Sequence, residues 1–250
     1  MTTIDVKAGP DARFVTAQFH VRPDTTDEVV IDEVWGDACY RWHAALVGRY
    51  VAPDRWRAFK GPIVVDLGAN IGTFSILAAL SGCGQVVAFE PDPDNLTAIE
   101  ANLALNGFAR QDGNPFAVRW RHPTGGLVDV WPVAVGANPG VVRFEADGGG
   151  GSQVTESGSS RVDQRRLDDV IGGYGTAAVA FVKCDIEGSE LEALRGGPET
   201  FGRAERLALE YHSQLGPEEW GDLVYELAMT HRLELIGRPQ LGGLLYGTRL

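Results

Sequence analysis

The sequence has few cysteines, few basic residues and no long apolar run, and each of these absences narrows the class of protein. Cys39, Cys83 and Cys184 are its only cysteines, and they lie far apart without a C-x-x-C pair. Their odd number and wide spacing predict reduced thiols, which favours a cytoplasmic setting over a disulfide framework. No apolar run approaches the ~20 residues that a membrane-spanning helix needs, and the polar N-terminus predicts no signal peptide.

Basic residues are outnumbered by acidic ones, with 22 Lys and Arg against 34 Asp and Glu and a formal net charge of −12. Nucleic acids and anionic membranes are bound by basic surfaces, so this charge opposes both as partners. The 250 residues, of which 44% are hydrophobic, fit a soluble globular protein with one large domain. The sequence leaves a homodimer open.

Strand-like and helix-like segments alternate along most of the chain, which predicts an α/β fold with a parallel sheet and crossover helices. We expect an N-terminal extension over residues 1–62, with a strand at 14–22 and a helix beginning near Asp27, packing on a core domain over residues 63–250. Within the core domain we expect strands at 63–67, 86–90, 128–135, 178–183, 206–211, 233–236 and 244–248, and a hairpin strand at 141–145.

Two further features of the core domain are a capped helix and two long irregular segments. Asp94 is expected to cap the helix after the second strand, and Asn106-Gly107 to end it. Residues 108–126 and the Gly- and Ser-rich residues 147–160 are predicted as long loops, which are either functional lids or plain surface excursions.

The most informative segment joins an apolar strand to a helix through the turn Gly68-Ala69-Asn70-Ile71-Gly72. Glu90 ends the next strand, 18 residues after Gly72, where a carboxylate can accept both ribose hydroxyls of a nucleoside. The turn departs from the G-x-G-x-x-G of dinucleotide sites, and Asp66 directly before it would repel a phosphate but suit a cationic sulfonium amino acid. The turn therefore favours S-adenosylmethionine over NAD.

Acidic residues end four of the expected strands, on the edge of the sheet where ligands of open α/β folds bind. They are Asp66, Glu90, Asp185 and the pair Glu210/His212. His212 is a candidate base for an acceptor hydroxyl, although a histidine at this place is about as often structural. Asp185 and Glu210, with His212, also form a candidate Mg²⁺ site, while any single acid among them can be a helix cap or a surface charge.

Three motifs together resemble the FkbM family of S-adenosylmethionine-dependent methyltransferases: Asp66 to Gly72, Phe89-Glu90-Pro91, and Lys183-Cys184-Asp185-Ile186-Glu187-Gly188. The resemblance covers roughly residues 22–212. It implies a class I methyltransferase (Rossmann-like) fold with a seven-stranded sheet and a reversed last strand, and methylation of hydroxyls on sugars or macrolide-type natural products. The donor is then expected to contact Asp66, Gly68, Asn70, Gly72, Phe74, Glu90, Pro91 and Ala134.

These features predict an O-methyltransferase that acts on a small-molecule hydroxyl, with Asp185, Glu210 and His212 as catalytic residues. A saccharide is favoured over a macrolide, because Trp120 and Trp131 offer faces for a sugar ring if they are not packed in the core. Two alternatives stay open: a non-catalytic S-adenosylmethionine-binding protein of the same fold, and an NAD-dependent oxidoreductase, against which the turn speaks.

Overall fold

The computed structural model describes residues 2–8, 15–37, 39–40, 62–112, 115–147, 150–175, 177–238 and 242–250. Much of the predicted N-terminal extension, residues 41–61, therefore lies outside the described part, as does Phe14 at the start of the first predicted strand. None of the helices in the described part has both the length and the apolar character that crossing a bilayer requires.

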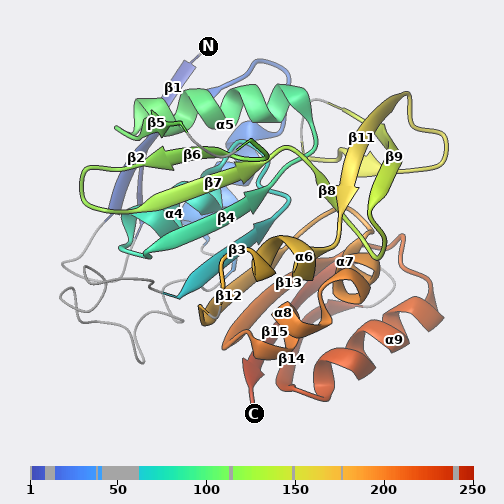
Figure 1. The fold of residues 1–250 in the computed structure, drawn as a ribbon. Helices are drawn as coiled ribbons and strands as arrows, with labels where there is room; N and C mark the ends of the chain where they lie inside the picture. Colours follow the sequence, from blue (N-terminus) through green and yellow to red (C-terminus); the bar gives the residue numbers. More distant parts are fainter. Residues whose placement is uncertain are drawn as a thin grey trace.

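A central sheet organises the molecule (Figure 1). Within the described residues it has nine strands: β3 (Ile63–Leu67), β4 (Gln85–Phe89), β5 (Ala109–Gln111), β6 (Val118–Arg121), β7 (Leu127–Trp131), β12 (Val179–Cys184), β13 (Arg206–Tyr211), β14 (His231–Arg238) and β15 (Gly242–Arg249). Their order is β14-β15-β13-β12-β3-β4-β7-β6-β5. The adjacent strands β13, β12, β3, β4 and β7 run parallel to one another, and β15 runs antiparallel to β13. The reversed last strand is therefore confirmed.

The sheet is wider than the seven strands that the sequence implied, because β5 and β6 extend it beyond β7. Both come from residues 108–126, which were predicted as a loop. An ion pair supports the register of β6 on β7: Arg119 on β6 faces Asp129 on β7, and its half-exposed guanidinium donates to the fully buried carboxylate at 2.6 Å. An unpaired charge at Asp129 would be costly to bury, so the extra strand supplies its partner.

The predicted third strand, 128–135, is in fact two strands that belong to different sheets. β7 ends before Pro132, which has no N–H to donate to a sheet. The following strand, β8 (Ala134–Val135), joins β9 (Gly140–Glu145), β10 (Gln153–Val154) and β11 (Ser160–Arg165) in a small sheet of order β10-β9-β11-β8. The predicted hairpin strand at 141–145 is thus confirmed as β9.

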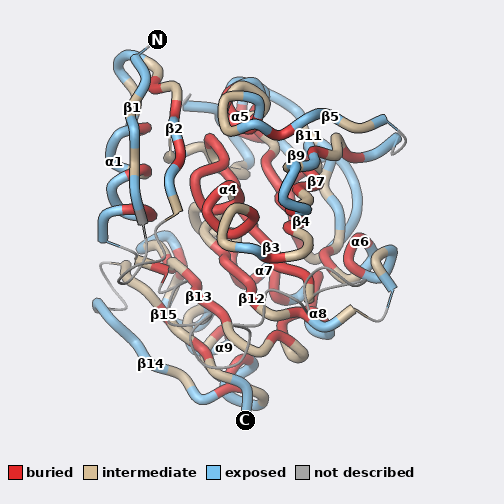
Figure 2. Tube along the Cα trace, turned by 90° about the vertical axis from the view of Figure 1, so that its left-hand side faces the viewer, coloured by how far each residue is buried: buried red, intermediate tan, exposed pale blue. Residues whose placement is uncertain are grey.

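Helices cover both faces of the central sheet, and two apolar cores fill the layers between. On one face lie α4 (Thr73–Leu80) and α5 (Pro93–Leu105), with side chains such as Val64 and Phe74. On the other lie α6 (Leu167–Gly172), α7 (Glu190–Gly196), α8 (Pro198–Arg203) and α9 (Pro217–Ala228), with Val65 and Phe201. Neighbouring residues such as Val64 and Val65 enter opposite layers, as the period of two in a strand requires. Figure 2 shows that the central strands and α4 are the most buried parts.

The described N-terminal residues pack on the α4 and α5 face. The strand β1 (Thr2–Ala8), which the sequence did not predict, pairs with β2 (Val15–Val21), which it did. A short helix α1 (Asp27–Ile31) continues as the π-helix η1 (Asp32–Gly36). Phe19 on β2 meets Trp35 on η1 edge-on at 5.6 Å, and both belong to the core that contains Phe74. These contacts bring the chain just after η1 to the carboxyl edge of the sheet.

Candidate active site

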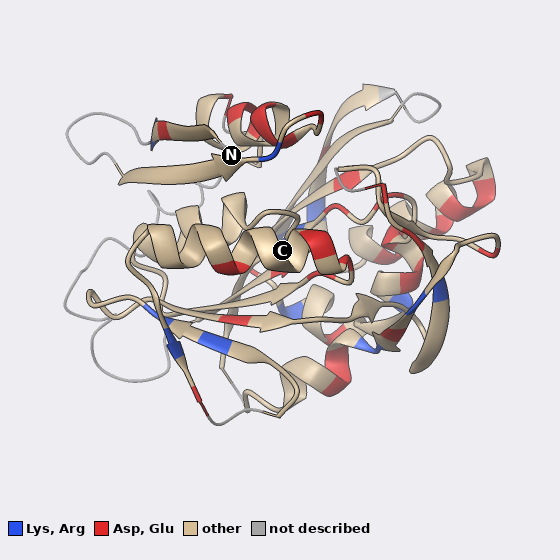
Figure 3. Ribbon diagram, turned by 90° about the horizontal axis from the view of Figure 1, so that it is seen from above, with Lys and Arg blue, Asp and Glu red and all other residues tan. Residues whose placement is uncertain are grey.

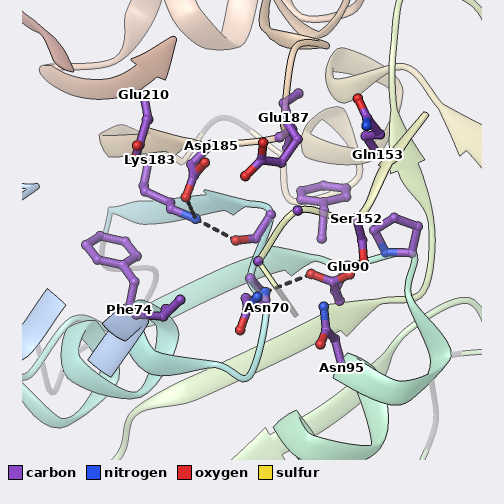
Figure 4. Close-up of a pocket in the computed structure, with 18 of the residues that line it drawn as sticks. Asn70, Phe74, Glu90, Asn95, Ser152, Gln153, Lys183, Asp185, Glu187 and Glu210 are labelled. Carbon is purple, nitrogen blue, oxygen red and sulfur yellow. Dashed lines mark hydrogen bonds and ion pairs between the residues drawn. The ribbon is translucent and has the colours of Figure 1, made fainter. Parts of the chain in front are cut away.

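A cavity of about 320 Å³ lies at the carboxyl edge of the parallel strands, where the sequence placed a ligand site (Figure 4). The glycine turn after β3 and the ends of β4, β12 and β13 supply much of its wall. Residues 133–135, residues 150–154 and the N-terminal segment also contribute to the wall. Of the predicted donor-site residues, the structure brings Gly68, Asn70, Phe74, Glu90, Pro91 and Ala134 to this cavity, together with Asp185 and Glu210.

The glycine turn has a backbone that only particular residues can adopt. Gly68 has φ +77°, and a Cβ placed there would lie 1.8 Å from the carbonyl oxygen of Asp185. The turn can therefore pass β12 this closely only with glycine at position 68. Asn70 also has a positive φ, of 51°, and its backbone N–H donates to Glu90 Oε2 at 2.7 Å. The turn and the tip of β4 are thus locked together.

Glu90 is buried at one end of the cavity. Its Oε1 accepts the backbone N–H of Asp92 at 2.9 Å, so backbone groups orient both carboxylate oxygens. Burial raises the pKa of Glu90 to about 7, although these N–H groups partly oppose the shift. A buried carboxylate that only accepts hydrogen bonds fits a pair of donors such as the vicinal hydroxyls of a ribose.

Two predicted donor-site residues do not line the cavity. Asp66 is fully buried beneath the turn, where it accepts a hydrogen bond from Ser75 Oγ at 2.6 Å and lies 3.4 Å from Lys183 Nζ. Gly72 faces the side chain of Ile99 instead. Asp66, for which the sequence predicted a direct contact with the donor, therefore lies beneath the cavity wall and contacts Lys183, which does line the cavity.

Lys183 ties the glycine turn to the acidic end of the cavity. Its ammonium group donates to the carbonyl of Gly68 at 2.5 Å and lies 3.5 Å from Asp185 Oδ2. Burial disfavours its charge, but the carboxylates of Asp185 and Asp66 outweigh burial and raise the pKa of Lys183. Lys183 therefore keeps its positive charge between Asp66 and Asp185. Figure 4 shows it between the turn and Asp185.

Asp185 and Glu210 lie near each other at the other end of the cavity, where Tyr40 contacts both. The Tyr40 hydroxyl donates to Asp185 Oδ2 at 2.8 Å and lies 3.4 Å from Glu210 Oε2. Burial, and then the charge of Asp185, raise the pKa of Glu210 to about 7. Glu210 thus changes its protonation state close to neutral pH, which suits a general base.

His212 lies behind these acids, outside the cavity wall. Its Nδ1 is 2.9 Å from Glu190 Oε1, and its Nε2 is 3.3 Å from Glu187 Oε2. Burial lowers the pKa of His212, but the hydrogen bonds to Glu187 and Glu190 outweigh burial and raise it to about 11. The imidazole therefore carries both protons at neutral pH, which argues against the prediction of His212 as a base.

The same protonation state bears on the predicted Mg²⁺ site. Among the described residues, the group whose ligand atoms lie within 4.8 Å of one another is Asp185, Glu187 and His212, with Glu187 in the place expected for Glu210. A histidine ligand must offer a metal a lone pair on one ring nitrogen, whereas each ring nitrogen of His212 already has a carboxylate partner, Nδ1 with Glu190 at 2.9 Å and Nε2 with Glu187 at 3.3 Å. These residues do not fit a resident divalent cation.

Sequence reasoning missed several residues that line the cavity, among them Glu33, Tyr40 and Ser152. Ser152 belongs to the Gly- and Ser-rich segment, and its hydroxyl donates to Asp92 Oδ2 at 2.7 Å, so this segment does reach the site. Neither Trp120 nor Trp131 lines the cavity: Trp120 is 6% exposed in the core, and Trp131 stacks on Phe89 at 6.4 Å.

The order of the strands, the reversed last strand and the cavity at the carboxyl edge define a class I, Rossmann-like methyltransferase fold. The family model of the methyltransferase FkbM domain matches residues 66–236. The chain belongs to this family and is an S-adenosylmethionine-dependent methyltransferase, as its sequence motifs predicted.

Several characterised relatives are methyltransferases too. The chain is 30% identical over 200 residues to the 31-O-demethyl-FK506 methyltransferase FkbM of Streptomyces tacrolimicus, covering 72% of each chain. It is 24% identical over 184 residues to the hexuronic acid methyltransferase AglP of Haloferax volcanii, covering 73% of this chain and 70% of AglP. The 2-O-methyltransferase NoeI of Sinorhizobium fredii is 25% identical over 197 residues, or 69% of each chain.

A crystal structure of the methyltransferase FkbM from Methylobacillus flagellatus KT has the same fold. It superposes with a TM-score of 0.51 and 24% sequence identity over 75% of this chain. The match spans 44% of that longer protein, so the likeness bears on the fold alone.

Proposed function

We propose that the protein transfers a methyl group from S-adenosylmethionine to a hydroxyl of a small molecule, and that this acceptor is a saccharide or glycoside rather than a macrolide. The observation that carries the proposal is a single cavity with Glu90 at one end and the pair Asp185 and Glu210 at the other. β4 and β13 are three strand spacings apart, or roughly 14 Å, which leaves room for a nucleoside and an acceptor side by side. The name of AglP supports a sugar acid as the kind of acceptor, and the name of NoeI supports an oxygen atom as the methylated position.

The donor half of the site is assigned as follows. Glu90 accepts the ribose hydroxyls, and the turn at Gly68 and Asn70 lies along the methionine portion. Phe74, Pro91 and Ala134 supply apolar contacts in the same cavity. S-adenosylmethionine brings an electrophilic methyl group on a sulfonium sulfur, so the protein has no need to activate the donor.

The acceptor half must orient a hydroxyl and remove its proton. Asp185 orients this hydroxyl, and Glu210, with a pKa raised to about 7, takes the proton. The imidazolium of His212 holds Glu187 and Glu190 in place behind the two acids. No metal ligand is needed in this scheme, and we expect dialysis against EDTA to leave the methyl-transfer rate unchanged. A loss that added Mg²⁺ restores would restore the metal as a participant.

The experiment that tests the function has two steps. Calorimetry with S-adenosylmethionine, S-adenosylhomocysteine and NAD comes first. A ligand that binds the folded protein stabilises it whether or not a reaction follows, so binding can be measured without turnover. Binding of NAD, without binding of S-adenosylmethionine or S-adenosylhomocysteine, would favour an oxidoreductase. A panel of methyl glycosides and one macrolide is then incubated with donor labelled on its methyl group. Label on a glycoside supports the proposal, label on the macrolide alone overturns the substrate class, and donor binding without transfer to any of them favours the non-catalytic alternative.

A further inference from the structure

Tyr40 lies outside residues 66–236, the part of the chain that the family model covers, yet it contacts both acids at the acceptor end. It follows the π-helix η1 and is 5% exposed, with its ring edge-on to Phe74 at 5.7 Å and 5.3 Å from Lys183 Nζ. The ring is therefore held by packing, and its position dictates where the hydroxyl points. That direction is toward the two carboxylates.

The contacts of Asp185 divide between its two oxygens. Oδ2 accepts the Tyr40 hydroxyl at 2.8 Å and lies 3.5 Å from Lys183 Nζ. Oδ1 lies 3.8 Å from His212 Nε2, which is beyond hydrogen-bonding distance. Tyr40 and Lys183 thus fix the position of Oδ2, and with it the orientation of the carboxylate.

The hydroxyl of Tyr40 also reaches Glu210, at 3.4 Å from Oε2. Two carboxylates at one site repel each other. The single hydroxyl proton of Tyr40 goes to Asp185 Oδ2 at 2.8 Å, and this bond holds the Asp185 carboxylate in place beside Glu210. Tyr40 is suited to this task because a phenol adds no charge of its own. Burial and the neighbouring Asp185 raise the pKa of Tyr40 well above its ordinary value, so its proton stays in place.

We propose that Tyr40 is a positioning residue of the methyl-transfer reaction: its hydroxyl holds the carboxylate of Asp185 in one orientation beside Glu210, as the acceptor hydroxyl requires. The inference rests on the proposed function, and it makes the N-terminal extension part of the catalytic unit. Tyr40 touches neither reacting atom. Its effect passes through the orientation of Asp185, and misplacing a catalytic group by about 1 Å can cost on the order of 100-fold in rate.

The test replaces Tyr40 with phenylalanine, which keeps the ring and removes only the hydroxyl. Tyr174→Phe is the matched control, because Tyr174 also donates to an aspartate, Asp129 Oδ2, at 2.8 Å, but lies outside the cavity wall. Crystal structures of both variants report the carboxylate of Asp185, calorimetry reports the affinity for S-adenosylhomocysteine, and kcat and KM are measured with the glycoside identified by the acceptor panel.

We expect the Asp185 carboxylate of Tyr40→Phe to rotate or to adopt two orientations, while that of Tyr174→Phe stays in place. We also expect kcat to fall about 10- to 100-fold with S-adenosylhomocysteine affinity unchanged. A carboxylate that keeps its orientation, or a kcat equal to that of the control, overturns the inference. The proposed function fails by a different result, namely if the wild-type protein does not bind S-adenosylhomocysteine. The orientation of the Asp185 carboxylate can still be measured in that case, because it needs no turnover.

Discussion

At the scale of single residues, Glu90 offers the most direct test of the donor site, because its carboxylate is buried and oriented by the N–H groups of Asn70 and Asp92. Glu90→Gln replaces one acceptor oxygen with a donor NH₂ group. We expect the affinity for S-adenosylhomocysteine to fall by about 1.5–3 kcal/mol, the range for hydrogen bonds to a charged group. Isothermal calorimetry measures the loss. Asp185→Asn, at the acceptor end, is the comparison variant and should keep its donor affinity while its rate falls. Equal affinities in wild type and Glu90→Gln would remove Glu90 from the donor site.

Glu210 leads to a prediction about the pH dependence of turnover. Its pKa is raised to about 7, and as a base it acts only when deprotonated, so kcat should fall about tenfold for each pH unit below 7. Because Glu210 interacts with Asp185, the measured value belongs to the pair. The glycoside assay between pH 5.5 and 9 gives the profile. In Glu210→Gln we expect a lower rate without this acid limb. A wild-type rate that is flat from pH 5.5 to 7 contradicts the assignment.

Many of the residues that the sequence predicted correctly as lining the cavity lie at or just after a strand end. Glu90 and Asp185 are examples, since strand topology alone brings such positions to one edge. The contacts of Asp66 and His212 depend on Lys183, Glu187 and Glu190, which only the fold brings near them. As a result, Asp66, predicted to contact the donor, lies beneath the glycine turn. His212, predicted to act as a base, is an imidazolium held by two carboxylates.

Tyr40 carried no sequence signal at all. No motif surrounds it, and it reaches Asp185 only because the N-terminal segment packs on the face of α4. Residues of this kind can be found from contacts in a folded structure, and not from spacing along the chain.

At the scale of elements, the start of α5 couples helix capping to the cavity. Asp92, and not the predicted Asp94, is the N-cap: its Oδ1 accepts the N–H of Asp94 at 2.8 Å, while Oδ2 accepts Ser152 Oγ. Asp92→Ala should lower the free energy of unfolding by about 1–3 kcal/mol, since it removes a cap and leaves Ser152 without this acceptor. Asp94→Ala, on the exposed first turn, should cost about 0.5 kcal/mol. Urea unfolding compares the two, and equal losses would show that the cap is misassigned.

Most of the element order could be predicted from apolar runs and turn residues, and β13 was predicted with its observed bounds. The failures have local causes. β5 and β6 are short, with three and four residues, and their apolar content is too low to stand out. β8 was merged with β7 because Val133 continues an apolar run across Pro132, and only the second sheet separates the two strands.

At the scale of the whole molecule, acidic positions outnumber basic ones over the ribbon in Figure 3, in keeping with the net charge of −12. Buried acids of the site contribute to this excess and hold protons that they would lose in the unfolded chain. Burial raises the pKa of Glu90 and that of Glu210 from an ordinary 4.5 to about 7. Glu187 and Glu190 raise the pKa of His212 from 6.5 to about 11 against the effect of burial.

All three groups bind protons more tightly in the folded state, so they shift stability in the same direction. Between pH 4.5 and 7 the two glutamates, and between pH 6.5 and 11 the histidine, carry more protons when folded than when unfolded. Stability therefore falls as pH rises through these windows. We expect the thermal midpoint at pH 9 to lie below that at pH 6 by at least ~2 °C, the shift that about 1 kcal/mol produces in a protein of this size.

Calorimetric scans of two histidine variants isolate the part that His212 contributes. His212→Gln should flatten the decline of the midpoint above pH 7, because the group that loses its proton there is gone. His122→Gln is the control, because its pKa shifts in the opposite direction. Burial lowers the pKa of His122, so this side chain is already neutral above pH 7, and its removal should leave the decline of the midpoint unchanged. If the decline above pH 7 is as steep in His212→Gln as in wild type, the imidazole is not held as a cation by Glu187 and Glu190. His212 would then be neutral near pH 7 and available again as the base.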